Sequence, residues 1–213
     1  DQVRIFNNLV HDCYYAGIEI SNWIVPHTGP KTDVRIVNNS VFRCGREVGG
    51  VVSGSGIYIE SVHPDDAGFV VMNNILSGNR QYQMRVREAA MVNTTLANNL
   101  IHGPVGPLPE GVLGMNPVVG DPLFVNPPAD FSLPSDSPAL GMGLGVDWLL
   151  ADYFGRPMRQ PPDLGAIQYI APNSPPVLLS IGNRSVRAGE PIRIGIQAHD
   201  ADSDTLQYTA SGE

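Results

Sequence analysis

The chain has 213 residues, and its charged fraction of 16% is low against the roughly 25% of typical soluble domains. The formal net charge of −8 argues against a nucleic-acid partner, because nucleic-acid-binding domains present a basic face. Apolar residues make up 42% of the chain, enough for a sizeable core, but they form no run long enough for membrane insertion.

Four stretches share the pattern apolar-x-apolar-x-Asn-Asn-x-apolar, in which x is any residue. They are 3–10, 34–41, 69–76 and, with Thr94 as the weak member, 94–101. The second Asn of each pair recurs at intervals of 31, 35 and 25 residues, at Asn8, Asn39, Asn74 and Asn99. Intervals of this size predict stacked structural units joined by loops of different length.

A second apolar segment follows each of the first three Asn pairs, at 17–21, 56–60 and 83–87. Its apolar residues lie two apart, which is typical of a strand with alternate side chains on opposite faces. Short strands without helical segments between them cannot form a parallel sheet with helical crossovers. We therefore predict an all-β solenoid in which each coil adds one rung, ~4.8 Å from the next, to several parallel sheets.

The Asn pairs suit the corners of such a coil, because Asn tolerates left-handed backbone and its amide can bond the same amide one rung on. The repeated Val-x-Ile-x-Asn-Asn-x-Val, followed by Gly-Ile-x-Ile, resembles the right-handed parallel β-helix of pectate-lyase-like proteins over about 1–106. The resemblance implies the fold. It leaves function open, because that superfamily contains lyases, hydrolases, epimerases and non-catalytic surface proteins.

Cys13 and Cys44 each lie five residues after the second Asn of a pair, so we expect them to stack in adjacent coils. Two alternatives follow. Equivalent Cα atoms of stacked strands, ~4.8 Å apart, lie within the range for a disulfide, but parallel Cβ vectors remain farther apart than the ~3.5–4.5 Å of a bridge. The pair is therefore either a disulfide or two buried thiols, and no Cys-x-x-Cys spacing predicts a zinc site.

If the apolar residues of the second segments point inward, the residues between them form outward columns. One column is Glu19, Tyr58 and Arg85, and the next is Ser21, Glu60 and Arg87. Repeat proteins gather function on such surfaces. We expect a polysaccharide partner, with ring stacking on Tyr58 and Trp23 beside the cleft. The alternative is a set of solvated cross-strand charge pairs.

Two reactions fit these residues. In β-elimination, Arg85 and Arg87 are the candidate cations for the enediolate, and His63 is the candidate proton-transfer group. The resemblance implies an Arg or Lys base, sometimes with calcium on the substrate carboxylate, although no motif here matches residue by residue. In hydrolysis, Glu19 and Glu60 are the candidate pair, which needs a carboxyl separation of ~5–9.5 Å.

Glycine and proline crowd residues 103–122, where the regular coils end. The order of short motifs that follows resembles the C-terminal closing segment of secreted β-helix proteins of the choice-of-anchor type. These motifs are Gly120-Asp121-Pro122, Asp130-Phe131, Ser137-Pro138-Ala139, Gly155-Arg156-Pro157 and Asp163-Leu164-Gly165. We assign 107–171 to this closing segment and expect it to cover the open end of the solenoid, with the apolar residues of 148–154 as cover.

Residues 171–176 form a proline-rich linker. Residues 172–213 resemble the opening strands of a cadherin-like or immunoglobulin-like module. The alternation of Ile192, Ile194 and Ile196 predicts a half-buried strand. Carboxylates at alternate positions suit calcium, and here they are Asp200, Asp202 and Asp204. The alternative for these three residues is a polar turn.

The first functional hypothesis is an extracellular polysaccharide lyase or glycoside hydrolase acting on an acidic polysaccharide. The alternative is a non-catalytic surface or adhesion protein with a glycan-binding or structural β-helix. Either hypothesis predicts a secreted or cell-surface location, and we expect a monomer. Because the sequence starts inside a repeat and stops inside a strand-rich module, we expect it to be a fragment of a longer protein.

Overall fold

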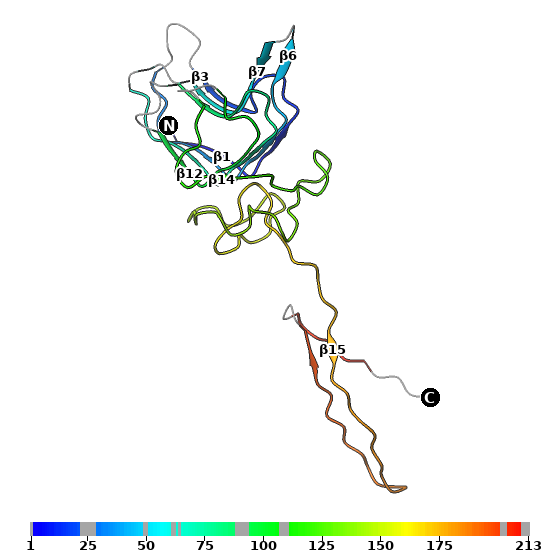
Figure 1. Ribbon diagram of the computed structural model, residues 1–213. Helices are drawn as coiled ribbons and strands as arrows, with labels where there is room; N and C mark the ends of the chain where they lie inside the picture. The colour runs from blue at the N-terminus through cyan, green and yellow to red at the C-terminus, as the bar shows by residue number, and fades with distance from the viewer. Residues whose placement is uncertain are drawn as a thin grey trace. The chain divides into compact units, whose positions relative to one another are not determined.

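The computed structural model contains strands and, among the residues that it describes, no helix (Figure 1). The described residues are 2–21, 29–48, 51–60, 63, 65–87, 94–106, 111–200 and 204–209. The chain divides into two compact units, Asp1–Tyr169 and Ile170–Glu213. A search of the described residues for a helix able to cross a membrane found none.

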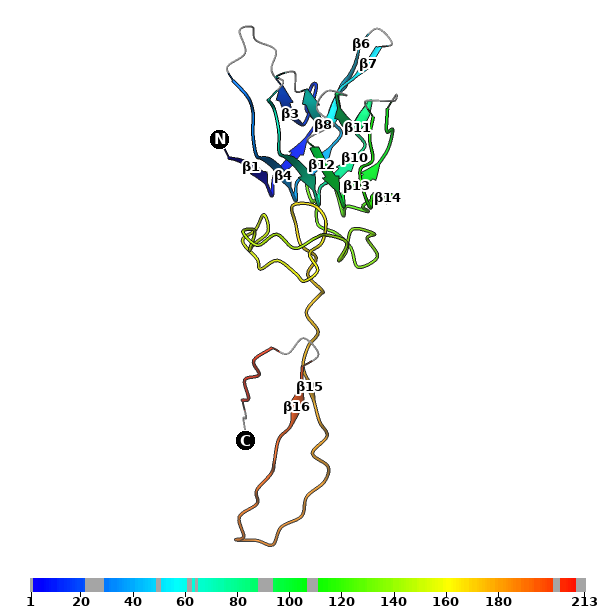
Figure 2. The same cartoon turned by 90° about the vertical axis from the view of Figure 1, so that its left-hand side faces the viewer.

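The first unit contains three parallel sheets and one antiparallel pair, β6 (Arg46–Val48) with β7 (Val51–Ser53) (Figure 2). Sheet A consists of β1 (Val3–Phe6), β4 (Val34–Val37), β9 (Phe69–Met72) and β12 (Thr94–Ala97). Sheet B consists of β2 (Leu9–His11), β5 (Ser40–Phe42), β10 (Ile75–Ser77), β13 (Leu100–His102) and β14 (Val118–Val119). Sheet C consists of β3 (Ile18–Ser21), β8 (Ser55–Glu60) and β11 (Tyr82–Val86). The first three coils each contribute one strand to all three sheets, and the fourth contributes β12 and β13 to sheets A and B, so the predicted parallel β-solenoid is confirmed.

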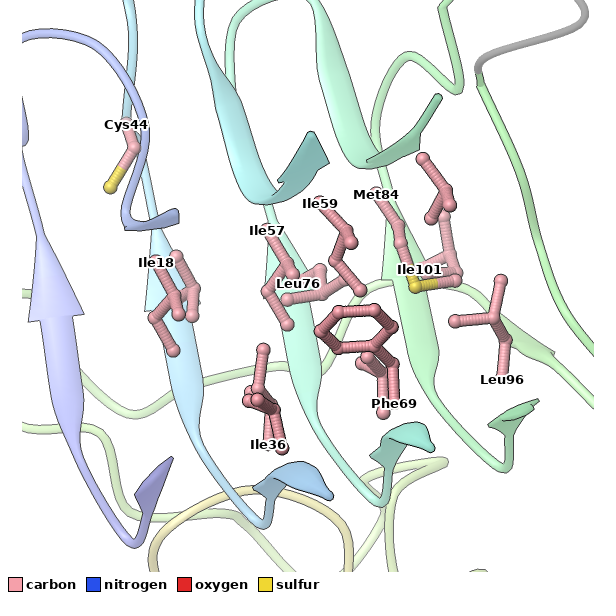
Figure 3. Packing of buried hydrophobic residues seen from close by; sticks show 14 residues of the cluster. Ile18, Ile36, Cys44, Ile57, Ile59, Phe69, Leu76, Met84, Leu96 and Ile101 are labelled. Atoms are coloured by element: carbon pink, nitrogen blue, oxygen red, sulfur yellow. The ribbon is translucent and has the colours of Figure 1, made fainter. Parts of the chain in front are cut away.

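The register follows the Asn pairs. Ile75 aligns with Ser40 on one side and with Leu100 on the other, which places equivalent repeat positions in one row. Inward side chains of all three sheets meet in one apolar core (Figure 3). Its labelled members include Ile36 and Phe69 from sheet A, Leu76 and Ile101 from sheet B, and Ile57, Ile59 and Met84 from sheet C.

The second Asn of each pair forms a ladder inside the coil. The Oδ1 atom of Asn74 accepts hydrogen bonds from the backbone N–H and the side-chain amide of Asn39, at 2.9 and 3.0 Å. Asn99 accepts from Asn74 in the same way, at 3.0 and 2.9 Å, and Asn39 accepts from Asn8. The amides of Asn39, Asn74 and Asn99 are fully buried, so each rung satisfies polar groups that burial would otherwise penalise.

The first Asn of each pair has a different role. All four adopt left-handed backbone, with φ of 52° at Asn7, 52° at Asn38, 58° at Asn73 and 50° at Asn98. This conformation is the one that Asn tolerates better than most residues. It turns the chain from sheet A into sheet B, and each of these side chains donates its amide to residues far along the chain.

Those distant residues belong to the closing segment. Asn7 donates to the Ala151 carbonyl at 2.7 Å, Asn73 to that of Leu144 at 2.8 Å and Asn98 to that of Met142 at 3.0 Å. Asn38 donates to the carbonyls of Asp163 and Gly165. Residues 120–169, the lateral segment, therefore lie along the side of the solenoid across all four coils (Figure 2).

The end of the solenoid is covered by the residues that precede the lateral segment. Val105, Val112 and Leu113 pack against the core, and the N–H of Val112 donates to the Met84 carbonyl at 3.2 Å. Within the closing segment expected over 107–171, Val112 and Leu113 therefore lie against the core. The lateral segment lies along the side of the solenoid instead. There the outward Asn amides donate hydrogen bonds to the carbonyl groups of its irregular backbone.

Two buried carboxylates organise the lateral segment. Asp152 accepts the backbone N–H groups of Phe154 at 2.9 Å, Arg156 at 2.9 Å and Gln168 at 3.1 Å, and it pairs with the Arg156 guanidinium at 2.8 Å. Burial by itself raises the pKa of Asp152, but the bonds from Arg156 and Gln168 outweigh it and hold the pKa below its ordinary value. Asp163 similarly accepts the N–H groups of Gly141 and Tyr169.

The two cysteines are free thiols in adjacent coils. The N–H of Gly45 donates to the Cys13 carbonyl at 2.8 Å, which fixes the predicted stacking. Burial raises the pKa of the Cys44 thiol to about 12, whereas Cys13 is only half-buried. Of the two alternatives for this pair, the structure therefore shows two unbridged thiols and no disulfide between them.

The second unit has a two-stranded antiparallel sheet of β15 (Val177–Leu178) and β16 (Ala198–His199). The half-buried strand predicted over 192–196 is absent, and Ile192, Ile194 and Ile196 are all exposed. The apolar residues do alternate, but the described residues of this unit supply no apolar layer that could bury these isoleucine side chains.

Candidate functional site

The outer face of sheet C carries the two predicted columns of polar residues. Tyr58 aligns with Glu19 on one side and with Arg85 on the other. Glu60 aligns with Ser21, and the N–H of Arg87 donates to the Ile59 carbonyl at 3.0 Å. The residues between them point into the core, as the alternation predicts. These are Ile18, Ile57, Ile59, Met84 and Val86.

The Arg85 guanidinium lies between two aromatic rings. Its central carbon is 4.4 Å from the ring centroid of Tyr58 and 5.0 Å from that of Tyr82. Both distances are within the range of cation–π attraction. Tyr58 is only 1% exposed, and burial raises its pKa to about 12. The ring therefore offers no face to a sugar, contrary to the expectation of stacking on Tyr58, and its role is to hold Arg85.

Arg87 is held by a buried carboxylate. Its Nη1 lies 2.6 Å from Oε1 of Glu60, whose side chain is 6% exposed, while that of Arg87 is 43% exposed. Oε2 of Glu60 is also buried and has no hydrogen-bond partner among the described residues. An ion pair of this kind fixes the position of its arginine and leaves part of the guanidinium open to solvent.

Glu19 and Glu60, the pair predicted for hydrolysis, lie in very different surroundings. Glu19 is exposed beside a hollow of ≈ 350 Å³ near the first coil, which Ser21 and Lys31 also line. Glu60 is enclosed beside Arg87. A carboxyl group that transfers a proton to a glycosidic oxygen must reach it, so the enclosure of Glu60 counts against this pair.

The remaining predicted site residues are His63, Trp23 and the three aspartates within 200–204. His63 follows β8, and its Nδ1 accepts the N–H of Asp65 at 3.2 Å. Trp23 and Asp202 are among the residues that the structure leaves undescribed. Asp200 is buried and accepts the N–H of Asp204 at 3.2 Å. No metal-binding cluster of His, Cys, Asp or Glu occurs in the described part of the chain, so the calcium site stays a prediction.

Tyr82 is the member of this face that the sequence did not indicate. Strict alternation along 82–86 assigns it to the inner side with Met84 and Val86. Tyr82 instead begins β11, where the chain enters the sheet from a turn, and its ring reaches Arg85. The sequence offered one signal for this contact: an aromatic residue stands at the start of the strand, three positions before Arg85.

Residues 1–101 match the family model of the right handed beta helix region. This match agrees with the three stacked parallel sheets and confirms the predicted fold class. Neither a curated protein nor a solved structure matches the chain.

Proposed function

We propose that the outer face of sheet C binds an acidic polysaccharide at the cell surface or outside the cell. The observation that carries the proposal is the placement of Arg85 and Arg87, two residues apart on one strand face, each held by a buried partner. Guanidinium groups match carboxylates in geometry and charge. Holding them in place before binding lowers the entropic cost of association.

The polymeric partner fits the form of this face. Sheet C presents three parallel strands in successive coils, so its outer columns run along the solenoid axis rather than into a closed pocket. A solenoid surface of this type suits an extended chain of sugars. The exposed carboxylate of Glu19 at the other end of the column disfavours acidic groups there, which gives the bound polymer a preferred position.

Cleavage by β-elimination is the second candidate function. Two adjacent guanidinium groups can stabilise the enediolate that forms when a proton is removed beside a uronate carboxyl group. His63 remains the candidate proton acceptor. Hydrolysis is less well supported, because Glu60 is enclosed and paired with Arg87.

Affinity electrophoresis in gels containing polygalacturonate or alginate tests the binding. We expect the wild-type protein to be retarded, and Arg85→Ala and Arg87→Ala each to bind about tenfold more weakly, as for loss of one charged hydrogen bond. Arg80→Ala is the matched control, because Arg80 is an exposed arginine of the turn before β11. In gels of neutral dextran, which offers no carboxylates, the wild type and all three variants should migrate alike.

Equal retardation of Arg85→Ala, Arg87→Ala and wild type would reject this face as the binding site. Ultraviolet absorbance of unsaturated sugar ends, measured on the same polymers, separates the two candidates. Release that depends on Arg85 supports β-elimination, whereas retardation without release supports a non-catalytic glycan-binding protein.

A further inference from the structure

The stretch 148–154 does not serve wholly as apolar cover. Leu149 is buried and Trp148 packs edge-on against Phe6, with ring centroids 5.3 Å apart. Tyr153 and Phe154, in contrast, are 50% and 60% exposed. Their rings pack against each other at 5.1 Å with an interplanar angle of 83°. Two neighbouring aromatic side chains are thus displayed on the surface of the lateral segment.

The turn that carries these rings is rigidly anchored. The fully buried Asp152 carboxylate accepts the N–H of Phe154 and that of Arg156, and Gly155 follows with φ of 78°. The N–H of Tyr153 donates to the Ala166 carbonyl at 2.8 Å. The backbone is therefore fixed on both sides of the ring pair, so a ligand does not have to order it.

We propose that Tyr153 and Phe154 form a stacking platform for the apolar faces of neutral sugar rings. Aromatic side chains present flat apolar faces, and Tyr adds a hydroxyl at the rim that can pair with sugar hydroxyls. The edge-to-face packing orients the two rings differently and leaves each one partly uncovered. The Arg156 guanidinium, 4.9 Å from the Phe154 centroid, supports that ring and lies beside the platform.

The size of the patch favours a sugar over a protein partner. Two half-exposed aromatic side chains offer roughly 200 Å² of surface, whereas a stable protein interface needs about 800 Å² on each partner. The platform therefore fits one or two sugar units of a polysaccharide chain.

This platform is separate from the site on sheet C. The lateral segment lies on the opposite side of the solenoid from β3, as both views show (Figures 1 and 2). The two surfaces also differ in the forces that they use. Stacking on rings is little affected by salt, whereas attraction between arginines and uronates is screened by it.

Affinity electrophoresis in gels of neutral polysaccharides, namely soluble β-glucan, arabinoxylan and galactan, tests the platform at high salt. We expect at least one of these polymers to retard the wild-type protein. Tyr153→Ala and Phe154→Ala should each weaken that retardation about fivefold or more. Thermal unfolding of both variants should stay close to wild type, because the removed side chains are half-exposed.

Three control variants separate the explanations. Leu150→Ala removes an exposed apolar side chain of the same segment and should leave the retardation unchanged. Tyr153→Phe keeps the ring and should retain most of it, and Arg85→Ala should have no effect in these gels. The proposal is overturned if no neutral polymer retards the wild type, or if Tyr153→Ala and Phe154→Ala are retarded as strongly as the wild type. It is also overturned if Leu150→Ala or Tyr153→Phe weakens binding as much as those two alanine variants do. None of these results bears on the acidic polymers, so failure here is distinct from failure of the sheet C site.

Discussion

Two sides of the same solenoid are built from the same repeat but differ in what covers them. At the corner between sheets A and B, the outward amides of the first Asn column are bound by the lateral segment. On the outer face of sheet C, Arg85 and Arg87 are fixed by buried partners yet remain partly exposed. Repetition therefore sets the rows of side chains, whereas the covering segment decides which rows are structural and which are open to a ligand.

The largest effect should come from the buried Asn ladder at the covered corner. Asn74→Ala removes the acceptor for two N–H groups of Asn39 and the donor to Asn99, so it should lower the free energy of unfolding by about 3–5 kcal/mol. Urea denaturation measures this loss. Asn8→Ala, in the exposed first rung, is the control and should cost about 1 kcal/mol. Equal losses at both positions would contradict the role of the buried ladder.

The next effect concerns the carboxylate that anchors the lateral segment. Asp152→Ala should lower the free energy of unfolding by about 3 kcal/mol, because it leaves Arg156 and several N–H groups without their acceptor. The folded-state pKa of Asp152 lies below its ordinary value. Its contribution is therefore present above the unfolded-state pKa of about 4 and is lost as the pH falls through the folded-state pKa.

Urea denaturation between pH 7 and pH 2 tests this dependence. The stability of the wild type should fall toward that of Asp152→Ala as the solution becomes more acidic. A difference between the two proteins that stays constant over this range would show that Asp152 does not act through its charge.

The smallest effect is expected on the open face. Glu60→Gln keeps the size of the side chain but removes the charge that positions Arg87. Because Arg87 is partly exposed and can be hydrated, the cost in stability should be only about 1 kcal/mol. Retardation by polygalacturonate should weaken about threefold, as expected for one side chain that loses its fixed position. Stronger binding by Glu60→Gln would show that net charge, rather than placement, governs this face.

Much of the fold could be predicted because the Asn pairs mark a repeated position. The offsets from Asn39 to Asn74 and from Asn74 to Asn99 match the rows of sheets A and B. The rows of sheet C, including the alignment of Tyr58 with Arg85, came from the alternating apolar segments that follow the Asn pairs. This works because a parallel stack repeats its side-chain environment at every rung. Variable loops change the interval without changing the row.

The surroundings of the site residues could not be predicted in the same way. Alternation assigns Tyr58 and Glu60 to the outer face, but it does not say what lies over that face, and both side chains are buried. The path of residues 120–169 could not be predicted either, because this irregular segment has no repeating sequence pattern. Its position depends on hydrogen bonds from Asn7 to Ala151 and from Asn98 to Met142, which join distant parts of the chain.

A crystal structure with a bound acidic oligosaccharide, such as a short oligogalacturonate, tests the central claim most directly. We expect uronate carboxylates on the outer face of sheet C, with oxygens about 2.7–2.9 Å from the guanidinium nitrogens of Arg85 and Arg87. An oligosaccharide bound elsewhere on the protein, with both arginines uncontacted, would contradict the account.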